Sequence, residues 1–199
     1  MMKRTAFAVA TALALSLGLT ACGNTSQASP ETQSSSATSI QETTQATAQS
    51  ATSTEKRVAK DGANMQTEDA SMPTRIPMEG GTKINMHFGD MVIPGVLNDS
   101  ETARALIAKL PLTQHVSRYA HDFCGTTEPL PYKEDDVHYG WLNGDIDYAT
   151  DAPYFTILFE DEAVSEQYGS QVNIGVITCP LNDIAGLQGS FDVRIELAE

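Results

Sequence analysis

The sequence predicts a mainly β fold over residues 82–199, a closed or nearly closed β-barrel with one or two short helices. Short apolar and β-branched runs recur along this stretch, and several alternate with polar residues. Turn residues such as Gly, Pro and Asn separate the runs, and only one segment has a clear helical stripe. A stretch of roughly 118 residues suffices for one domain with one core.

A β-hairpin opens this domain. In "KINMHF" the residues Ile84, Met86 and Phe88 alternate with polar neighbours, which is typical of a half-buried strand. Gly89 and Asp90 predict a two-residue turn, and "MVIPGVL" is the returning strand.

The clearest helix follows the hairpin. Asn98, with Glu101 three residues later, predicts a capping box at its start. Pro111 stops the helix. Its apolar stripe consists of Ala103, Leu106, Ile107 and Leu110.

Residues 121–136 form a long irregular stretch, after which the strand runs resume. These runs are "VHYGWL", "DIDYA", "YFTILF", "SQVNIGVITC" and "SFDVRIEL", and the short helical turn "LNDIAGLQG" separates the last two. Within "GDIDY", Asp145 and Asp147 are candidates for a paired carboxylate site.

The first 22 residues have the parts of a secretory signal. Lys3 and Arg4 precede an apolar stretch at 6–19, which is shorter than the roughly 20 residues that a membrane-spanning helix needs. "LTAC", ending at Cys22, resembles the lipobox of bacterial lipoproteins. That resemblance implies cleavage before Cys22, a lipid on its sulfur, and an extracytoplasmic protein anchored in the cell membrane. An ordinary secretory signal and a retained membrane anchor are the alternatives.

Residues 23–81 are predicted to be a disordered linker. The stretch is dominated by Ser, Thr, Gln and Ala, and it has almost no large apolar side chain. Such a segment buries too little surface to offset about 1–2 kcal/mol of backbone entropy per residue. The linker would hold the domain away from the bilayer.

Charge argues against a nucleic-acid partner. The chain has 12 Lys and Arg against 26 Asp and Glu, a net charge of −14. Phosphate neutralisation requires a basic surface, which this composition does not supply. We expect an acidic coat that keeps an exported domain soluble, with cation binding as the alternative.

Two cysteines remain once Cys22 carries a lipid. Cys124 and Cys179 lie in an exported domain, where a disulfide between them would persist. Two small buried thiols are the alternative, since the sequence does not say whether the two Cα atoms approach closely enough.

The order of the segments resembles the cyclophilin-like domain family of bacteria. "LNDSETARALIAKLPL", "GDIDYATDAPYFTILF" and "NDIAGL" match best, and the resemblance covers residues 82–199. It implies a cyclophilin-like closed barrel of eight strands capped by helices. It also implies that "GDIDY" forms a tight barrel turn, which Gly144 allows and Asp145 caps, in place of a paired carboxylate site.

Cyclophilins proper are peptidyl-prolyl cis-trans isomerases, but their Phe-His-Arg and Phe-x-x-Gln-Gly-Gly-Asp signatures do not occur here. The local candidate for a catalytic residue is Arg118, and a solvated strand arginine is the alternative. The candidate ligand-binding floor consists of Trp141, Tyr154, Phe155 and Phe159, which are also plausible core residues.

We expect no metal and no cofactor. "EDDVH", with Glu134, Asp135, Asp136 and His138, offers oxygen ligands for Ca²⁺ but has no glycine at a spaced turn, so a solvated acidic loop is expected. His115, His121, His138 and Cys124 have no recognised zinc spacing.

The expected function is binding of a peptide or small ligand without efficient catalysis, by a lipid-anchored extracytoplasmic protein. A fold alone does not establish an activity, so efficient isomerisation is not expected. The alternative is a prolyl isomerase that acts on exported proteins.

Overall fold

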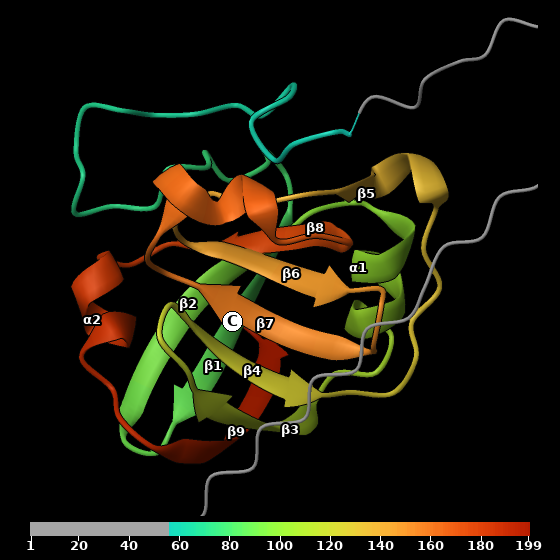
Figure 1. Ribbon diagram of the computed structural model, residues 1–199. Helices are drawn as coiled ribbons and strands as arrows, with labels where there is room; N and C mark the ends of the chain where they lie inside the picture. The colour runs from blue at the N-terminus through green and yellow to red at the C-terminus, as the bar shows by residue number, and fades with distance from the viewer. Residues whose placement is uncertain (1–55) are drawn as a thin grey trace, which may run out of the picture. The chain divides into compact units, whose positions relative to one another are not determined.

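Nine strands and two short α-helices form the part of the chain that this computed structural model describes, residues 56–199 (Figure 1). The elements run in the order β1 (Thr82–Phe88), β2 (Met91–Leu97), α1 (Glu101–Ile107), β3 (Leu112–Arg118), β4 (Asp122–Thr126), β5 (Val137–His138), β6 (Asp145–Ala149), β7 (Tyr154–Leu158), β8 (Gln171–Ile177), α2 (Leu181–Ala185) and β9 (Ser190–Leu197).

Eight of these strands close into an antiparallel barrel. Their order is β2-β1-β9-β3-β4-β7-β6-β8, and a further pairing between β2 and β8 joins the two ends. The closed barrel predicted from the sequence is therefore confirmed. Within residues 56–199, closure removes the long open strand edges that an open sheet would have.

Strand β8 is shared by two partners on one side. The two-residue strand β5 pairs with its start, at Gln171 and Val172, and β2 pairs with its end, from Gly175 onward. Asn173 and Ile174 lie between the two pairings. Asn98, which follows β2, fills this interruption: its backbone N–H donates to the Ile174 carbonyl at 2.9 Å and its side-chain amide donates to the Asn173 carbonyl at 2.9 Å.

The pairing of β6 with β8 is also irregular. Ile146 lies opposite Gly175 and Asp147 lies opposite Asn173, so one residue of β8 is left over as a bulge. A bulge bends its strand and redirects the neighbouring side chains. Here it accompanies the interruption on the other side of β8.

The barrel interior follows the predicted alternation. Ile84, Met86 and Phe88 of β1 are buried, as are Val193 and Ile195 of β9. Leu197, expected on the same face of β9, is exposed because it lies at the end of the strand. The aromatic rings of the core pack edge to face, with Phe88 and Phe123 at a centroid distance of 5.2 Å.

Helix α1 begins differently from the prediction. Its N-cap is Ser100, whose hydroxyl accepts a hydrogen bond from the Ala103 N–H at 3.1 Å. Asn98 lies two residues earlier and accepts from the Ser100 N–H at 3.0 Å. The predicted capping box is therefore wrong: the N-cap lies two residues later, and Ala103, three residues after it, has no side chain that could complete a box. The expected turn between β1 and β2 is present, with Gly89 at φ 61°.

Residues 57–81, called the strap below, lie against the barrel. They were expected to belong to a disordered linker that reaches residue 81, and the structure corrects that boundary. Main-chain hydrogen bonds tie the strap down: Ala59 donates to Tyr139 at 2.8 Å, Thr74 donates to Asn143 at 2.8 Å, and Ser71 accepts from Leu181 at 2.8 Å. Figure 1 shows the strap as the blue-green trace that joins the start of the described chain to β1.

The predicted signal, Cys22 and the linker up to residue 55 lie outside the described residues. Among residues 56–199 no helix combines the length and the apolar character needed to cross a membrane.

Candidate functional site

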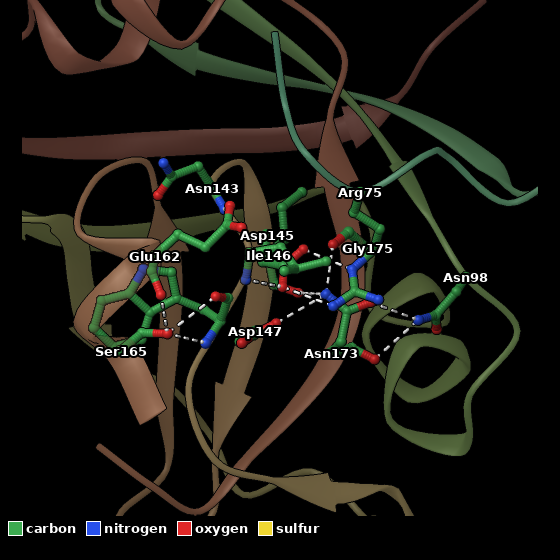
Figure 2. A network of polar contacts seen from close by, with 12 residues as sticks. Arg75, Asn98, Asn143, Asp145, Ile146, Asp147, Glu162, Ser165, Asn173 and Gly175 are labelled. Carbon is green, nitrogen blue, oxygen red and sulfur yellow. Dashed lines mark hydrogen bonds and ion pairs between the residues drawn. The ribbon is translucent and has the colours of Figure 1, made fainter. Parts of the chain in front are cut away.

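A buried ion pair joins the strap to the barrel. Arg75 donates from Nε to one Asp145 oxygen at 2.6 Å and from Nη2 to the other at 2.8 Å (Figure 2). The second Asp145 oxygen also accepts from the Leu142 N–H at 2.9 Å, which is the turn cap expected at this position. Gly144 has a φ of 99° and lies so close to the strap that an added Cβ would come within 2.4 Å of Pro73.

A second carboxylate lies beside this pair. Asp145 and Asp147 are two residues apart on β6, so they share one face of the strand, and both are 0 % exposed. One Asp147 oxygen accepts from the Asn173 amide at 2.9 Å, and the other has no partner among the described residues. Burial, followed by the charge of Asp145, raises the pKa of Asp147 well above its usual range.

His138 completes the polar cluster. It ends β5, is only 7 % exposed, and neither ring nitrogen has a hydrogen-bond partner within residues 56–199. Burial lowers the pKa of His138, against an opposing effect of the Asp145 charge. A neutral imidazole offers one donor and one acceptor. Both nitrogens are covered, and the backbone of Tyr139 and Gly140 lies close enough to act on the pKa of the ring.

A cavity of about 560 Å³ adjoins the cluster. His138, Arg75, Asn98 and Asn173 line it together with the start of the strap and the first turn of α1. It therefore lies at the interruption of β8, between the strands β2 and β5. A second cavity of about 510 Å³ shares Arg75, Asn98 and Asn173 with the first, so the strap leaves space on two sides of Arg75.

The structure brings the predicted catalytic residue Arg118 against Phe159. The guanidinium carbon lies 4.6 Å from the centre of the Phe159 ring and 6.0 Å from that of Phe123. Its Nη1 is buried and has no partner among the described residues. A guanidinium over an aromatic face is a favourable contact in its own right.

The four predicted floor residues do not form one surface. Trp141, Phe155 and Phe159 are almost completely buried, whereas Tyr154 is 38 % exposed. Trp141 stacks on Tyr168 at a centroid distance of 5.5 Å and donates from Nε1 to the Glu160 carbonyl at 2.8 Å. The 560 Å³ cavity is lined neither by these four residues nor by Arg118.

Cys124 and Cys179 are both free thiols, so the candidate disulfide is not formed in the structure. Cys124 lies on β4, and Cys179 lies between β8 and α2. Burial raises the pKa of Cys124 to about 12 and that of Cys179 to about 11. Both groups therefore stay protonated near neutral pH and are poor nucleophiles.

Residues 56–199 contain no grouping of three His, Cys, Asp or Glu side chains that would suit a metal ion. Asp135 is exposed, and Asp136 lines the cavity beside His138.

Sequence reasoning missed most of the polar cluster. Asp145 and Asp147 carried a signal, since their spacing in a strand places them on one face and "GDIDY" is embedded in apolar sequence. The sequence indicates His138 only as a candidate metal ligand. Arg75 gave no signal, because it lies in a stretch whose composition predicts a linker.

The model of the Cyclophilin-like family matches residues 86–196 of the chain. The chain is also similar to the solution structure of a hypothetical protein from Archaeoglobus fulgidus, with 20 % sequence identity and a TM-score of 0.49. The match covers 59 % of this chain and 95 % of the archaeal chain. No curated protein matches the sequence.

Proposed function

The chain belongs to the cyclophilin-like family, and we propose that its barrel binds a small polar ligand in the 560 Å³ cavity beneath the strap. We propose further that a lipid on Cys22 anchors the protein on the extracytoplasmic face of the cell membrane. The lipobox-like "LTAC" and the signal at residues 1–22 support this second part.

The observation that carries the binding proposal is the state of His138. Burying a polar group without a hydrogen bond costs about 1–3 kcal/mol by mutational measures, so buried polar groups are nearly always paired. His138 keeps two unpaired nitrogens on the wall of a cavity whose volume falls in the range of small-molecule sites. Both nitrogens are covered in the structure, so a bound molecule would supply the missing partners only after the His138 ring turns toward the cavity.

The neighbouring charged groups favour binding over chemistry. Arg75 and Asp145 are engaged with each other through two hydrogen bonds, and Asp147 is fully buried. None of the three is placed to exchange a proton with a molecule in the cavity. They support the cavity wall instead.

A fragment screen on the full-length protein tests this function. We expect compounds whose binding shifts the NMR signals of the His138 ring and of the Asn98 and Asn173 side-chain amides. His138→Phe should weaken these compounds at least tenfold, and His115→Phe, at an exposed position on β3, is the matched control. A screen in which no compound shifts the His138 ring, with the fold intact by circular dichroism, would remove the proposal.

Prolyl isomerisation is the second candidate, because Arg118 combines an unpartnered Nη1 with an aromatic neighbour. A donor to the proline nitrogen above an apolar ring is the arrangement that this chemistry needs. We expect no acceleration, since Nη1 is buried and Phe159 is almost completely covered. An exchange rate well above buffer in an NMR assay of a proline peptide, lost in Arg118→Ala, would favour the enzyme instead.

A further inference from the structure

We infer that the ligand of the 560 Å³ cavity is a small zwitterion, either a free amino acid or a short peptide with both ends free. The inference rests on the proposed binding function and specifies its ligand class. Three features of the cavity support it. These are the signs of the charges that line it, the number of those charges that already have a partner, and the two ring nitrogens of His138 that have no hydrogen-bond partner.

Charges of both signs surround the cavity. Of the ten Lys and Arg residues in 56–199, four line it, whereas only four of the 23 Asp and Glu residues do. The lining cations are Arg57, Arg75, Arg104 and Lys133, and the lining acids are Asp61, Asp99, Glu101 and Asp136. The cavity is therefore a balanced site on a strongly acidic protein.

Two of the cations and one of the acids are already engaged, and one of these contacts is the bond from Arg104 Nη1 to the Asp99 carbonyl. Arg75 is bound by Asp145, and one oxygen of Asp61 accepts a hydrogen bond from the Val58 N–H at 3.3 Å. The other five form no ion pair with any described side chain. Two cations, Arg57 and Lys133, and three acids, Asp99, Glu101 and Asp136, thus line the cavity without a side-chain partner among the described residues.

This balance discriminates between ligand classes. A simple anion would meet the three open carboxylates as well as the net charge of −14. A simple cation would meet Arg57, Arg104 and Lys133, and would find carboxylates elsewhere on the surface without these repulsions. A zwitterion places a carboxylate near the cations and an ammonium group near the acids, so both of its charges gain.

His138 fits the same class from the inner wall. Its neutral ring has one donor and one acceptor, both covered in the structure. Once the ring turns toward the cavity, the carbonyl and N–H groups of an amino acid or peptide would complement them. Asn98 and Asn173 are largely engaged with the backbone and with Asp147, so the recognition of polar groups inside the cavity falls to His138.

Calorimetry on the full-length protein at low ionic strength tests the inference. The probes are the free amino acids and a Gly-Xaa dipeptide set, followed by the tightest binder in three capped forms: N-acetylated, C-amidated and doubly capped. We expect each single cap to weaken binding at least tenfold and the double cap to abolish it.

Variants of the lining charges test which end of the ligand each charge binds. Lys133→Gln should reduce the preference for a free carboxylate, and Glu101→Gln should reduce the preference for a free ammonium group. Lys83→Gln and Asp90→Asn change the same charges at exposed positions outside the cavity and should leave binding unchanged.

The outcomes separate the inference from the function on which it rests. If His138-dependent fragments exist but no amino acid or dipeptide binds, or if capped and free forms bind equally, the zwitterion is wrong and the binding site remains. If no fragment binds at His138, the proposed binding function and the zwitterion inference are both wrong.

Discussion

Arg75 compensates the buried negative charge of the Asp145 carboxylate. Asp145 is completely buried, and its two oxygens are held by the Arg75 guanidinium together with the Leu142 N–H. Breaking a buried pair by removing one partner leaves an uncompensated charge, whereas replacing both partners is far better tolerated. Removing Arg75 alone should therefore destabilise the fold more than replacing Arg75 and Asp145 together.

Arg75→Met should lower the free energy of unfolding by about 3–5 kcal/mol, because the Asp145 carboxylate is left buried and unpaired. Urea denaturation followed by circular dichroism measures this loss. The double variant Arg75→Met/Asp145→Asn should recover part of it. Lys60→Met, which breaks the exposed pair of Lys60 with Glu166, should change stability by less than about 1 kcal/mol. Equal losses in the two single variants would contradict the prediction.

Burial of Asp122 predicts that the stability of the fold depends on pH with the opposite sign from that expected for an ion-paired carboxylate. It begins β4 and is nearly buried, and burial raises its pKa from 3.8 to about 6, although the charges of His121 and Arg118 oppose the shift. The folded state thus binds the proton more tightly than the unfolded state. The contribution of Asp122 to stability is greatest below about pH 4 and is lost as the pH rises to about 6.

Asp122→Asn should remove this loss. Relative to the wild type, the variant should gain about 1–3 kcal/mol of unfolding free energy between pH 4 and pH 7, since one pKa unit corresponds to about 1.4 kcal/mol. Urea curves at four pH values in this range measure the difference. Asp90→Asn, at an exposed turn, should follow the wild type throughout, and an Asp122→Asn curve parallel to the wild type would rule out the assignment.

At the level of elements, the strap is the part that the sequence could not place. The β1–β2 hairpin with its Gly89 turn, the helix that ends before Pro111 and the alternation in β9 were all predicted, because each has a periodic apolar face or a local turn signal. The strap contacts the barrel through main-chain hydrogen bonds and through the side chain of Arg75. Neither kind of contact produces a periodic pattern in the sequence. The helix cap was misplaced because Asn98 and Ser100 are both favourable cap residues.

The candidate site could be predicted only in part for the same reason. The spacing of Asp145 and Asp147 is visible in the sequence, but the cavity depends on residues that five separate segments bring together. The interruption of β8 between β5 and β2 is a property of the closed barrel, and it becomes visible only when strand pairing is known.

Truncation distinguishes the strap from the predicted linker. A chain that begins at residue 82 loses the Arg75–Asp145 pair and the main-chain ties of the strap, so its free energy of unfolding should fall by at least about 2 kcal/mol. A chain that lacks residues 23–55 should keep the wild-type value. Equal urea midpoints for the two shortened chains would show that the strap contributes nothing to stability.

At the scale of the whole molecule, the acidic charge bears on how the protein is held at a membrane. A net charge of −14 gives no attraction to an anionic bilayer, so the proposed attachment depends on the lipid at Cys22. Two or more acyl chains anchor a protein stably, whereas one holds it only marginally.

Cys22→Ser should therefore move the protein from the membrane fraction to the soluble fraction of bacterial cells. Mass spectrometry of the wild type should show a diacylglycerol-modified N-terminal cysteine. Cys124→Ser is the matched control and should remain in the membrane fraction. An unmodified Cys22 in cells would remove the anchor while leaving the barrel and its cavity unaffected.

The position of the first described residues has a mechanical consequence. Arg57 and Val58 line the cavity, and they join the barrel through the Val58–Tyr139 bridge and the hydrogen bonds around it. A pulling force on the N-terminal part of the chain would reach this bridge before any strand of the barrel. Tension would thus open one side of the cavity first while the barrel stayed folded, and it would speed the release of the proposed ligand.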